Sequence, residues 1–265
     1  MMTGKTIAVT GVASGIGAAT ARLLKDRGAT VIGFDRHEPT TPVDAHISID
    51  LANEQSIATA VQQASEVTNG RIDALCNVAG VPPTAPPALV LQVNFLGLRA
   101  FTEAMIPHLC DGGAIVNVAS LAGMGWPERI DLCKDLFAVG RLGKADAFCA
   151  AFNINSENCY EFSKEAIIVW TMQCWNRWHD RGIRINAVSP SAVDTPILDD
   201  FMQTVAIRAR ATAPGLNIQP TLVQPDEVAA VIAFLCSDDS RCLTGANIPV
   251  DGGLLAARTA HNLSF

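Results

Sequence analysis

A tyrosine and a lysine stand four residues apart in the segment Tyr160-Glu161-Phe162-Ser163-Lys164. On a helix, residues at this spacing share one face, so both side chains are expected to point the same way. An ammonium group beside a phenol favours the phenolate and lowers the pKa of the tyrosine from about 10. Such a phenolate can remove the proton of an alcohol while a hydride leaves the neighbouring carbon. The same spacing also occurs on solvated helix surfaces, so this hypothesis needs a second signal.

A glycine-rich loop near the N-terminus supplies that signal. Gly11, Gly15 and Gly17 follow a predicted strand and open a predicted helix. Gly11 allows a tight turn, Gly15 lets the backbone approach a pyrophosphate, and Gly17 lets the helix pack closely on the strand. The loop therefore predicts a dinucleotide site, in which Ser14 and Ile16 are also expected to contact the cofactor.

A carboxylate ends the second predicted strand. Asp35 lies 18 residues after Gly17, where it can accept hydrogen bonds from the adenosine ribose and repel a 2′-phosphate. This position predicts NAD rather than NADP as the cofactor, although the adjacent Arg36 can hold that phosphate. Asp50 and Leu51 follow the third predicted strand and are expected to border the adenine. The other interpretation of Asp50 is a turn before a helix.

Strand-length apolar segments alternate with longer helical patterns along the chain. The predicted strands cover residues 6–10, 30–34, 46–49, 72–76, 114–119, 184–188 and 246–250. The predicted helices cover residues 16–27, 53–68, 89–109, 160–181 and 226–235. This alternation predicts an α/β fold with one doubly wound, Rossmann-type parallel sheet of about seven strands and helices on both faces. We expect a single domain over residues 1–265.

The composition excludes several classes of protein. Hydrophobic residues make up 49% of the chain and charged residues 17%, the opposite of the balance in a disordered protein. The net charge of −7 disfavours nucleic acid as a partner. The eight cysteines form no CxxC pair and the five histidines are scattered, so we expect reduced thiols and no metal site. We find no signal-peptide pattern and no apolar run of about 18 residues, which predicts a cytoplasmic protein without membrane contact.

Further motifs, in the same order along the chain, resemble those of the short-chain dehydrogenase/reductase family. They are Cys76-Asn77-Val78-Ala79-Gly80, Asn94, Ser120, Ser189-Pro190-Ser191-Ala192-Val193-Asp194-Thr195 and Asp251-Gly252-Gly253. The resemblance covers nearly the whole chain and includes the glycine loop and the Tyr160–Lys164 pair.

The resemblance implies a role for each matching residue. Tyr160 would be the catalytic acid/base, and Lys164 would bind the nicotinamide ribose. Ser120 would hydrogen-bond the substrate oxygen, and Asn94 would support a water-linked proton path to Lys164. The remaining implied cofactor contacts are Asn77, Ala79, Gly80, Val193 and Thr195.

Three features depart from the family pattern. Ser191 replaces a glycine that is usual near the nicotinamide, and only 14 residues separate Asp35 from Asp50, which leaves little room for the usual helix. An insertion over 126–158 precedes Tyr160 and shows helical apolar spacing. The combination resembles a bacterial subgroup of the family that acts on hydroxysteroids and on coniferyl alcohol.

The resemblance therefore implies an NAD-dependent oxidoreductase that interconverts a hydrophobic alcohol and its aldehyde or ketone. Candidate substrates are an aryl or allylic alcohol such as coniferyl alcohol, a cyclic terpene alcohol and a hydroxysteroid. A dinucleotide-binding regulatory protein without turnover is the alternative, although a sensor needs no acid/base. An enoyl reductase is disfavoured, because the tyrosine and lysine of those enzymes are spaced further apart.

We expect a mostly apolar substrate pocket that no charged side chain reaches, with a lid over 196–214. Its predicted lining residues are Ser120, Leu121, Met124, Trp126, Tyr160, Ser191, Ile197, Phe201 and Met202. Members of the family are commonly tetramers that pack the helix after Gly80 and the Tyr160 helix against their copies. The insertion is expected to obstruct one such contact, which predicts a homodimer with the insertion near its interface.

Overall fold

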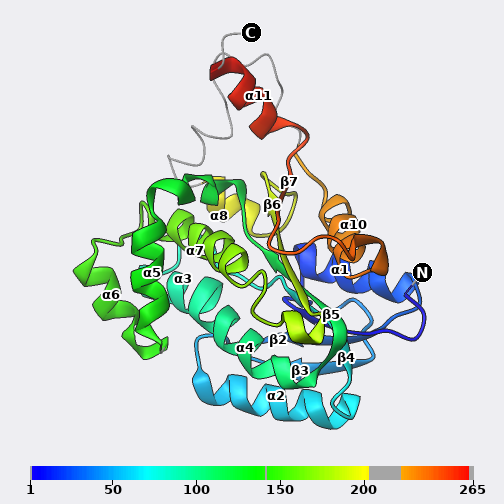
Figure 1. The fold of residues 1–265 in the computed structure, drawn as a ribbon. Coiled ribbons are helices and arrows are strands. Elements are labelled where there is room, and N and C mark those ends of the chain that lie inside the picture. The colour runs from blue at the N-terminus through cyan, green and yellow to red at the C-terminus, as the bar shows by residue number, and fades with distance from the viewer. Residues whose placement is uncertain (1, 141, 203–221, 263–265) are drawn as a thin grey trace.

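The computed structural model describes residues 2–140, 142–202 and 222–262, which build a parallel sheet with the strand order β3-β2-β1-β4-β5-β6-β7 (Figure 1). The strands are β1 (Thr6–Thr10), β2 (Thr30–Asp35), β3 (Ala45–Ser48), β4 (Ile72–Asn77), β5 (Leu109–Val118), β6 (Arg184–Pro190) and β7 (Asn247–Val250). The predicted doubly wound sheet is confirmed. The strand order reverses between β1 and β4, and sheets of this kind bind ligands beyond the carboxyl ends of the strands at that point.

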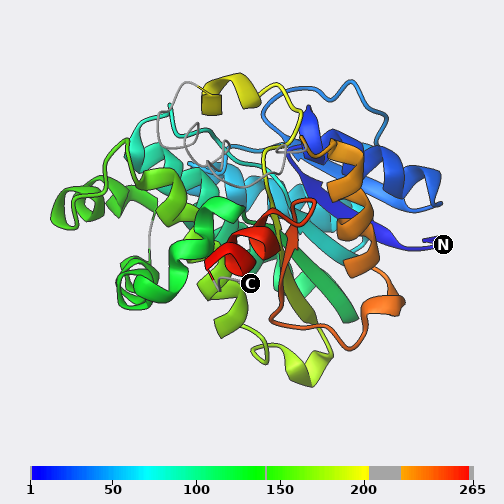
Figure 2. The same cartoon turned by 90° about the horizontal axis from the view of Figure 1, so that it is seen from above.

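Two layers of helices cover the sheet and bury separate apolar cores. One layer consists of α1 (Gly15–Asp26) and α10 (Pro225–Leu235), and the other of α2 (Glu54–Thr68), α4 (Leu98–Met105) and α7 (Cys159–Gln173) (Figure 2). Successive strand residues alternate between the two cores: Ile7 and Val9 join the α1 side, whereas Ala8 joins the opposite side. Because both faces are covered, successive inner residues of a central strand such as β1 are buried and apolar on both faces.

α7 ends earlier than its sequence pattern predicts. The helix stops at Gln173 rather than near residue 181, because the chain must turn there toward β6. Within this turn His179–Arg181 form a 3-10 helix, and Gly182 adopts a left-handed conformation with φ of 63°. The shorter helix still carries Tyr160 and Lys164 in its first two turns.

The long helix between β4 and β5 contains a π-helical turn. It runs from α3 (Pro87–Leu91) through the π-helical segment Gln92–Gly97 into α4. Among the described residues, Pro87–His108 is the only helix long and apolar enough to span a membrane, which corrects the expectation of no such segment. Of its most apolar window, 61% is buried inside the fold, so this helix belongs to the protein core.

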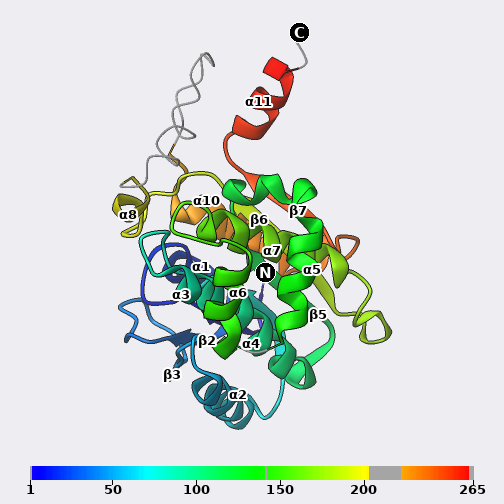
Figure 3. The same cartoon turned by 90° about the vertical axis from the view of Figure 1, so that its left-hand side faces the viewer.

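The segment between β5 and α7 forms two helices that pack on the body of the same chain. These are α5 (Ile130–Val139) and α6 (Ala145–Ala151) (Figure 3). Phe137 of α5 stacks on Phe95 with ring centroids 5.2 Å apart, and Phe148 of α6 stacks on Phe162 at 6.0 Å. The Arg99 guanidinium donates to the carbonyl oxygen of Phe137 over 2.7 Å. The two helices therefore cover the side of the molecule formed by α3, the π-helical segment and α7.

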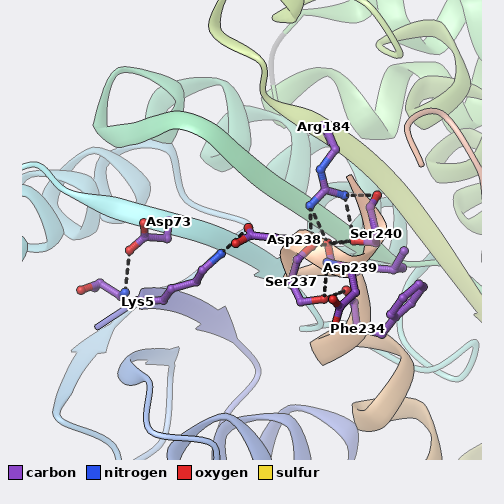
Figure 4. A network of polar contacts seen from close by, with 10 residues as sticks. Lys5, Asp73, Arg184, Phe234, Ser237, Asp238, Asp239 and Ser240 are labelled. Carbon is purple, nitrogen blue, oxygen red and sulfur yellow. Dashed lines mark hydrogen bonds and ion pairs between the residues drawn. The ribbon is translucent and has the colours of Figure 1, made fainter. Parts of the chain in front are cut away.

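An arginine at the start of β6 ties the sheet to the end of α10. The Arg184 guanidinium donates to the carbonyl oxygens of Leu235 and Ser237 (Figure 4). A helix leaves its last carbonyl oxygens without partners inside the helix, so these bonds satisfy groups that would otherwise need water. They hold α10 on the sheet beside α1.

Candidate active site

The loop between β1 and α1 has a geometry that requires its glycines. Gly11 has φ of 78°, and a Cβ there would lie 2.9 Å from the backbone of Ala79. A Cβ on Gly17 would lie 2.0 Å from the carbonyl oxygen of Gly11. Gly15 faces Thr195, which follows β6. The loop therefore leaves a cradle at the N-terminus of α1, where backbone N–H groups favour a phosphate.

A cavity of about 650 Å³ opens beyond the glycine loop and extends to α7. The predicted cofactor residues that line it are Gly11, Ser14, Gly15, Ile16, Gly17, Asp35, Asp50, Leu51, Ala79, Gly80, Lys164, Val193 and Thr195. The predicted substrate residues that line it are Ser120, Leu121, Tyr160, Ser191, Ile197 and Phe201. The cradle and the carboxylate beyond β2 fit a dinucleotide, because the first suits a pyrophosphate and the second a ribose.

Tyr160 and Lys164 face the cavity from successive turns of α7. Ser120, which follows β5, lines the same cavity, and its side chain favours the ionised form of the Tyr160 hydroxyl. Lys164 Nζ donates to the carbonyl oxygen of Val118 over 3.0 Å and lies 5.6 Å from the centroid of the Tyr160 ring. The ring of Phe201 packs edge-on against Tyr160, with centroids 4.8 Å apart. The hydroxyl groups of Tyr160 and Ser120 and the amino group of Lys164 thus lie at one cavity, where the Phe201 ring packs against Tyr160.

Burial controls the protonation of both ionisable groups. It raises the pKa of the Tyr160 phenol above the usual range, and the hydrogen bond with Ser120 offsets that shift only in part. Burial also lowers the pKa of Lys164 to about 8. The expected net lowering of the Tyr160 pKa is therefore corrected, because desolvation of the phenol outweighs the effects that favour the phenolate in this structure.

Asn94 lies in the π-helical segment and is fully buried behind the cavity. Its Oδ1 accepts from the N–H of Val81 over 2.8 Å, and its Nδ2 donates to the Val81 carbonyl oxygen and the Ser163 hydroxyl. A Cβ on Gly80 would lie 3.2 Å from Asn94 Oδ1 and 3.8 Å from Lys164 Nζ. Gly80 therefore lies between the two side chains, and Asn94 holds the loop after β4.

The aspartates after β2 and β3 line the cavity and also hold backbone turns. Asp35 accepts from the N–H groups of Ala13 and His37, each over 3.0 Å, and the first bond joins β2 to the glycine loop. Asp50 accepts from the N–H of Ala52 over 2.9 Å, which supports the interpretation of a turn before α2. Residues 36–44, all of them described, contain no helix, as the short interval between the aspartates predicts.

Ser191 stands where the family pattern has glycine. Its backbone lies outside the left-handed region, so the position does not require glycine. Its hydroxyl is buried at the cavity wall and has no hydrogen-bond partner among the described residues. Because an unpaired buried hydroxyl costs about 1–3 kcal/mol, this position favours a ligand that can bond to it.

Three further predicted site residues do not reach the cavity. The Asn77 side chain donates to Thr102 and Asn117 in a buried network of polar groups. Met124 lines a smaller depression, and Trp126 packs partly buried against the core on the α7 side. The 3-10 helix Leu121–Glu128 carries these two side chains past the cavity, which the motif after Ser120 does not indicate.

The predicted lid over 196–214 lies largely outside the described residues, as does the side chain of Met202. Its described part contains α8 (Leu198–Met202). Ile197, Leu198 and Phe201 line the cavity and form an apolar wall.

Two residues of the C-terminal helix α11 (Leu254–Asn262) also line the cavity, although the sequence did not place this helix. Leu254 is buried, and Arg258, one turn later, is half-buried. Arg258 corrects the expectation that no charged side chain reaches the pocket. The helical spacing of Leu254 and Arg258 indicates that the two side chains share one face of a helix. This spacing does not indicate what that face packs against.

Comparison with models of protein families identifies the family of this chain. The family model described as short chain dehydrogenase matches residues 5–130, and the model described as Enoyl-(Acyl carrier protein) reductase matches residues 140–255. The fold and the cradle accord with an oxidoreductase that uses NAD or NADP. The chain belongs to the short-chain dehydrogenase/reductase family, and within it this protein is an alcohol dehydrogenase.

Similar proteins cover almost the full length of the chain. It is 46% identical to the coniferyl-alcohol dehydrogenase of Pseudomonas sp., over 96% of this chain and 97% of that protein. It is 30% identical to the 3-alpha-hydroxysteroid dehydrogenase/carbonyl reductase of Comamonas testosteroni, over 94% of this chain and 95% of that protein. The crystal structure of a 3-alpha-hydroxysteroid dehydrogenase from Pseudomonas sp., complexed with NADH, matches with a TM-score of 0.84 and 31% identity, over 97% of this chain and 99% of that one.

Proposed function

We propose that this protein is an NAD-dependent dehydrogenase that interconverts a hydrophobic alcohol, foremost an aryl or allylic alcohol, and its aldehyde or ketone. The observation that carries the proposal is that Tyr160, Ser120 and Lys164 line one cavity, with Lys164 Nζ 5.6 Å from the centroid of the Tyr160 ring. The 46% identity to a coniferyl-alcohol dehydrogenase supports the aryl and allylic class over cyclic terpene alcohols and hydroxysteroids.

The proposed mechanism removes a proton and a hydride from the alcohol. The bound nicotinamide supplies the hydride acceptor. Ser120 hydrogen-bonds the substrate oxygen, and the Tyr160 phenolate accepts the proton of the hydroxyl group as the hydride leaves the carbon that bears this oxygen. In the reverse direction the Tyr160 phenol returns that proton to the carbonyl oxygen. Lys164, in its ammonium form, stabilises the phenolate, and Phe201 keeps water from the reacting oxygen.

Two further observations support the choice of NAD and the compartment. The Asp35 carboxylate borders the cavity beyond β2, where it disfavours a 2′-phosphate, whereas the neighbouring Arg36 is exposed to solvent. All eight cysteines are free thiols and six of them are buried. Free thiols in this number fit a reducing compartment, so we place the protein in the cytoplasm.

Absorbance of NADH during incubation with cinnamyl alcohol tests the proposal. We expect turnover with NAD in preference to NADP. Tyr160→Phe should lower kcat about 10²–10⁴-fold while the affinity for NAD is retained, since the change removes the ionisable oxygen and keeps the ring. Binding of NAD without turnover by the parent would favour the regulatory alternative. Equal catalytic efficiency with NADP would show that Arg36 outweighs Asp35.

A further inference from the structure

The helix α11 is fixed at its start and supplies one wall of the cavity. The Asp251 carboxylate accepts from the N–H groups of Gly253 and Leu255, which anchors the first turn of the helix. Leu254 and Arg258 are four residues apart, so they lie on one face of α11, and both line the cavity. Figures 1 and 3 show α11 extending beyond the end of β7.

Arg258 borders the end of the cavity where Tyr160 and Ser120 meet. A second depression of about 350 Å³ shares Leu121, Ala122 and Arg258 with the main cavity. Leu121 and Ala122 directly follow Ser120 in the chain, so Arg258 lies at this end. The opposite end is bordered by residues that follow β2 and β3, because those strands and β7 stand at opposite edges of the sheet.

The surroundings of Arg258 differ on its two sides. The second depression carries four glutamates together with Arg129: Glu128, Glu157, Glu161 and Glu165. On the side of the main cavity, Arg258 has the apolar side chains of Leu121, which borders both depressions, and of Leu254, one turn earlier on α11. A guanidinium has five N–H donors and no acceptor, so it can keep partners on the acidic side and still donate to a ligand in the cavity.

We propose that Arg258 is a specificity-determining residue that binds an oxygen atom on the end of the substrate remote from the reacting carbon. This inference rests on the proposed dehydrogenase function. The oxygen must accept a hydrogen bond, as a phenolic or phenolate oxygen on an aromatic ring does. Aryl alcohols that carry such an oxygen are therefore preferred over unsubstituted ones, because only the oxygen adds a hydrogen bond to a charged group.

The test compares cinnamyl alcohol with 4-hydroxycinnamyl alcohol in the parent enzyme and in Arg258→Leu, with NAD present. The variant should lower kcat/KM for the hydroxylated alcohol about 10- to 100-fold, mainly through KM, because one hydrogen bond to a charged group is lost. The value for cinnamyl alcohol should change less than about twofold. Arg258→Lys, which keeps the charge, should restore part of the preference.

Arg36→Leu is the matched control, because Arg36 follows β2 and borders the other end of the same cavity. Its ratio between the two alcohols should equal that of the parent. An equal loss on both alcohols in Arg258→Leu, or no loss on either, would overturn the inference. Dissociation constants of the two alcohols, measured by calorimetry with NADH, which cannot accept a hydride from an alcohol, keep the inference separate from turnover. If the parent binds the hydroxylated alcohol no more tightly than Arg258→Leu does, Arg258 does not bind the remote oxygen. Tighter binding by the parent without turnover would contradict only the proposed dehydrogenase function.

Discussion

The protonation of Lys164 is governed by burial rather than by a carboxylate partner. Its pKa is lowered to about 8 in the fold, against 10.5 for an ordinary lysine. Below pH 8 the side chain is charged in both the folded and the unfolded state, so the desolvation penalty acts in full. Between pH 8 and 10.5 the unfolded chain binds more protons than the fold, and the penalty from this residue disappears as the pH rises.

Lys164→Met should therefore stabilise the protein without added cofactor while abolishing efficient turnover. At pH 7 the free energy of unfolding should rise by about 2 kcal/mol, and the gain should become small at pH 10.5. Urea unfolding at both pH values measures the change. Lys144→Met is the control, because Lys144 is exposed and its replacement removes no buried charge. A variant destabilised equally at both pH values would contradict the argument.

For single residues, the sequence correctly predicted that Tyr160 and Lys164 share one helix face. It did not predict the direction in which the pKa of Tyr160 shifts. The spacing of Tyr160 and Lys164 is a local property of a helix, so their common face follows from the sequence alone. The direction of the pKa shift of Tyr160 depends on how much water the whole fold removes from the phenol. The orphaned hydroxyl of Ser191 likewise depends on neighbours from distant segments.

At the scale of elements, the inserted helices contribute to the core of the chain that carries them. Phe148 of α6 is 4% exposed and stacks on Phe162 of α7, whereas Phe152, one turn later, is 42% exposed. Phe148→Ala should lower the free energy of unfolding by about 3 kcal/mol, because a buried ring leaves a cavity. Phe152→Ala should change it by less than about 1 kcal/mol. Chemical unfolding of the two variants measures the difference, and equal losses would show that α6 is not held through Phe148.

Elements whose signals are local were predicted well, and those that depend on packing were not. The strands and the glycine loop follow from apolar runs and from turns that only glycine permits. The π-helical segment, the early end of α7 and the position of α11 are set by what each meets in the fold. Gly97, for example, packs so that an added Cβ would lie 2.0 Å from the carbonyl oxygen of Leu51, a contact between segments far apart in the sequence.

At the scale of the whole molecule, we propose a two-fold homodimer. α5 and α6 cover the side formed by α3, the π-helical segment and α7 within one chain, so two copies of the chain would meet there through a different surface. Closed two-fold assembly is the commonest solution for soluble oligomers and needs only one self-complementary surface. Light scattering at micromolar protein should give twice the mass of one chain. A tetramer would show that the inserted helices leave both family contacts available.

The cavity is assembled from both ends of the chain, from Gly11 to Arg258. During synthesis on the ribosome, the glycine cradle and the strands beside it emerge first, and α11 emerges after every strand of the sheet. A nascent chain that stops before residue 254 would present the cradle but lack the wall that Leu254 and Arg258 contribute. On the role proposed for Arg258, a growing chain would acquire this part of its substrate preference only after every strand of the sheet has been made.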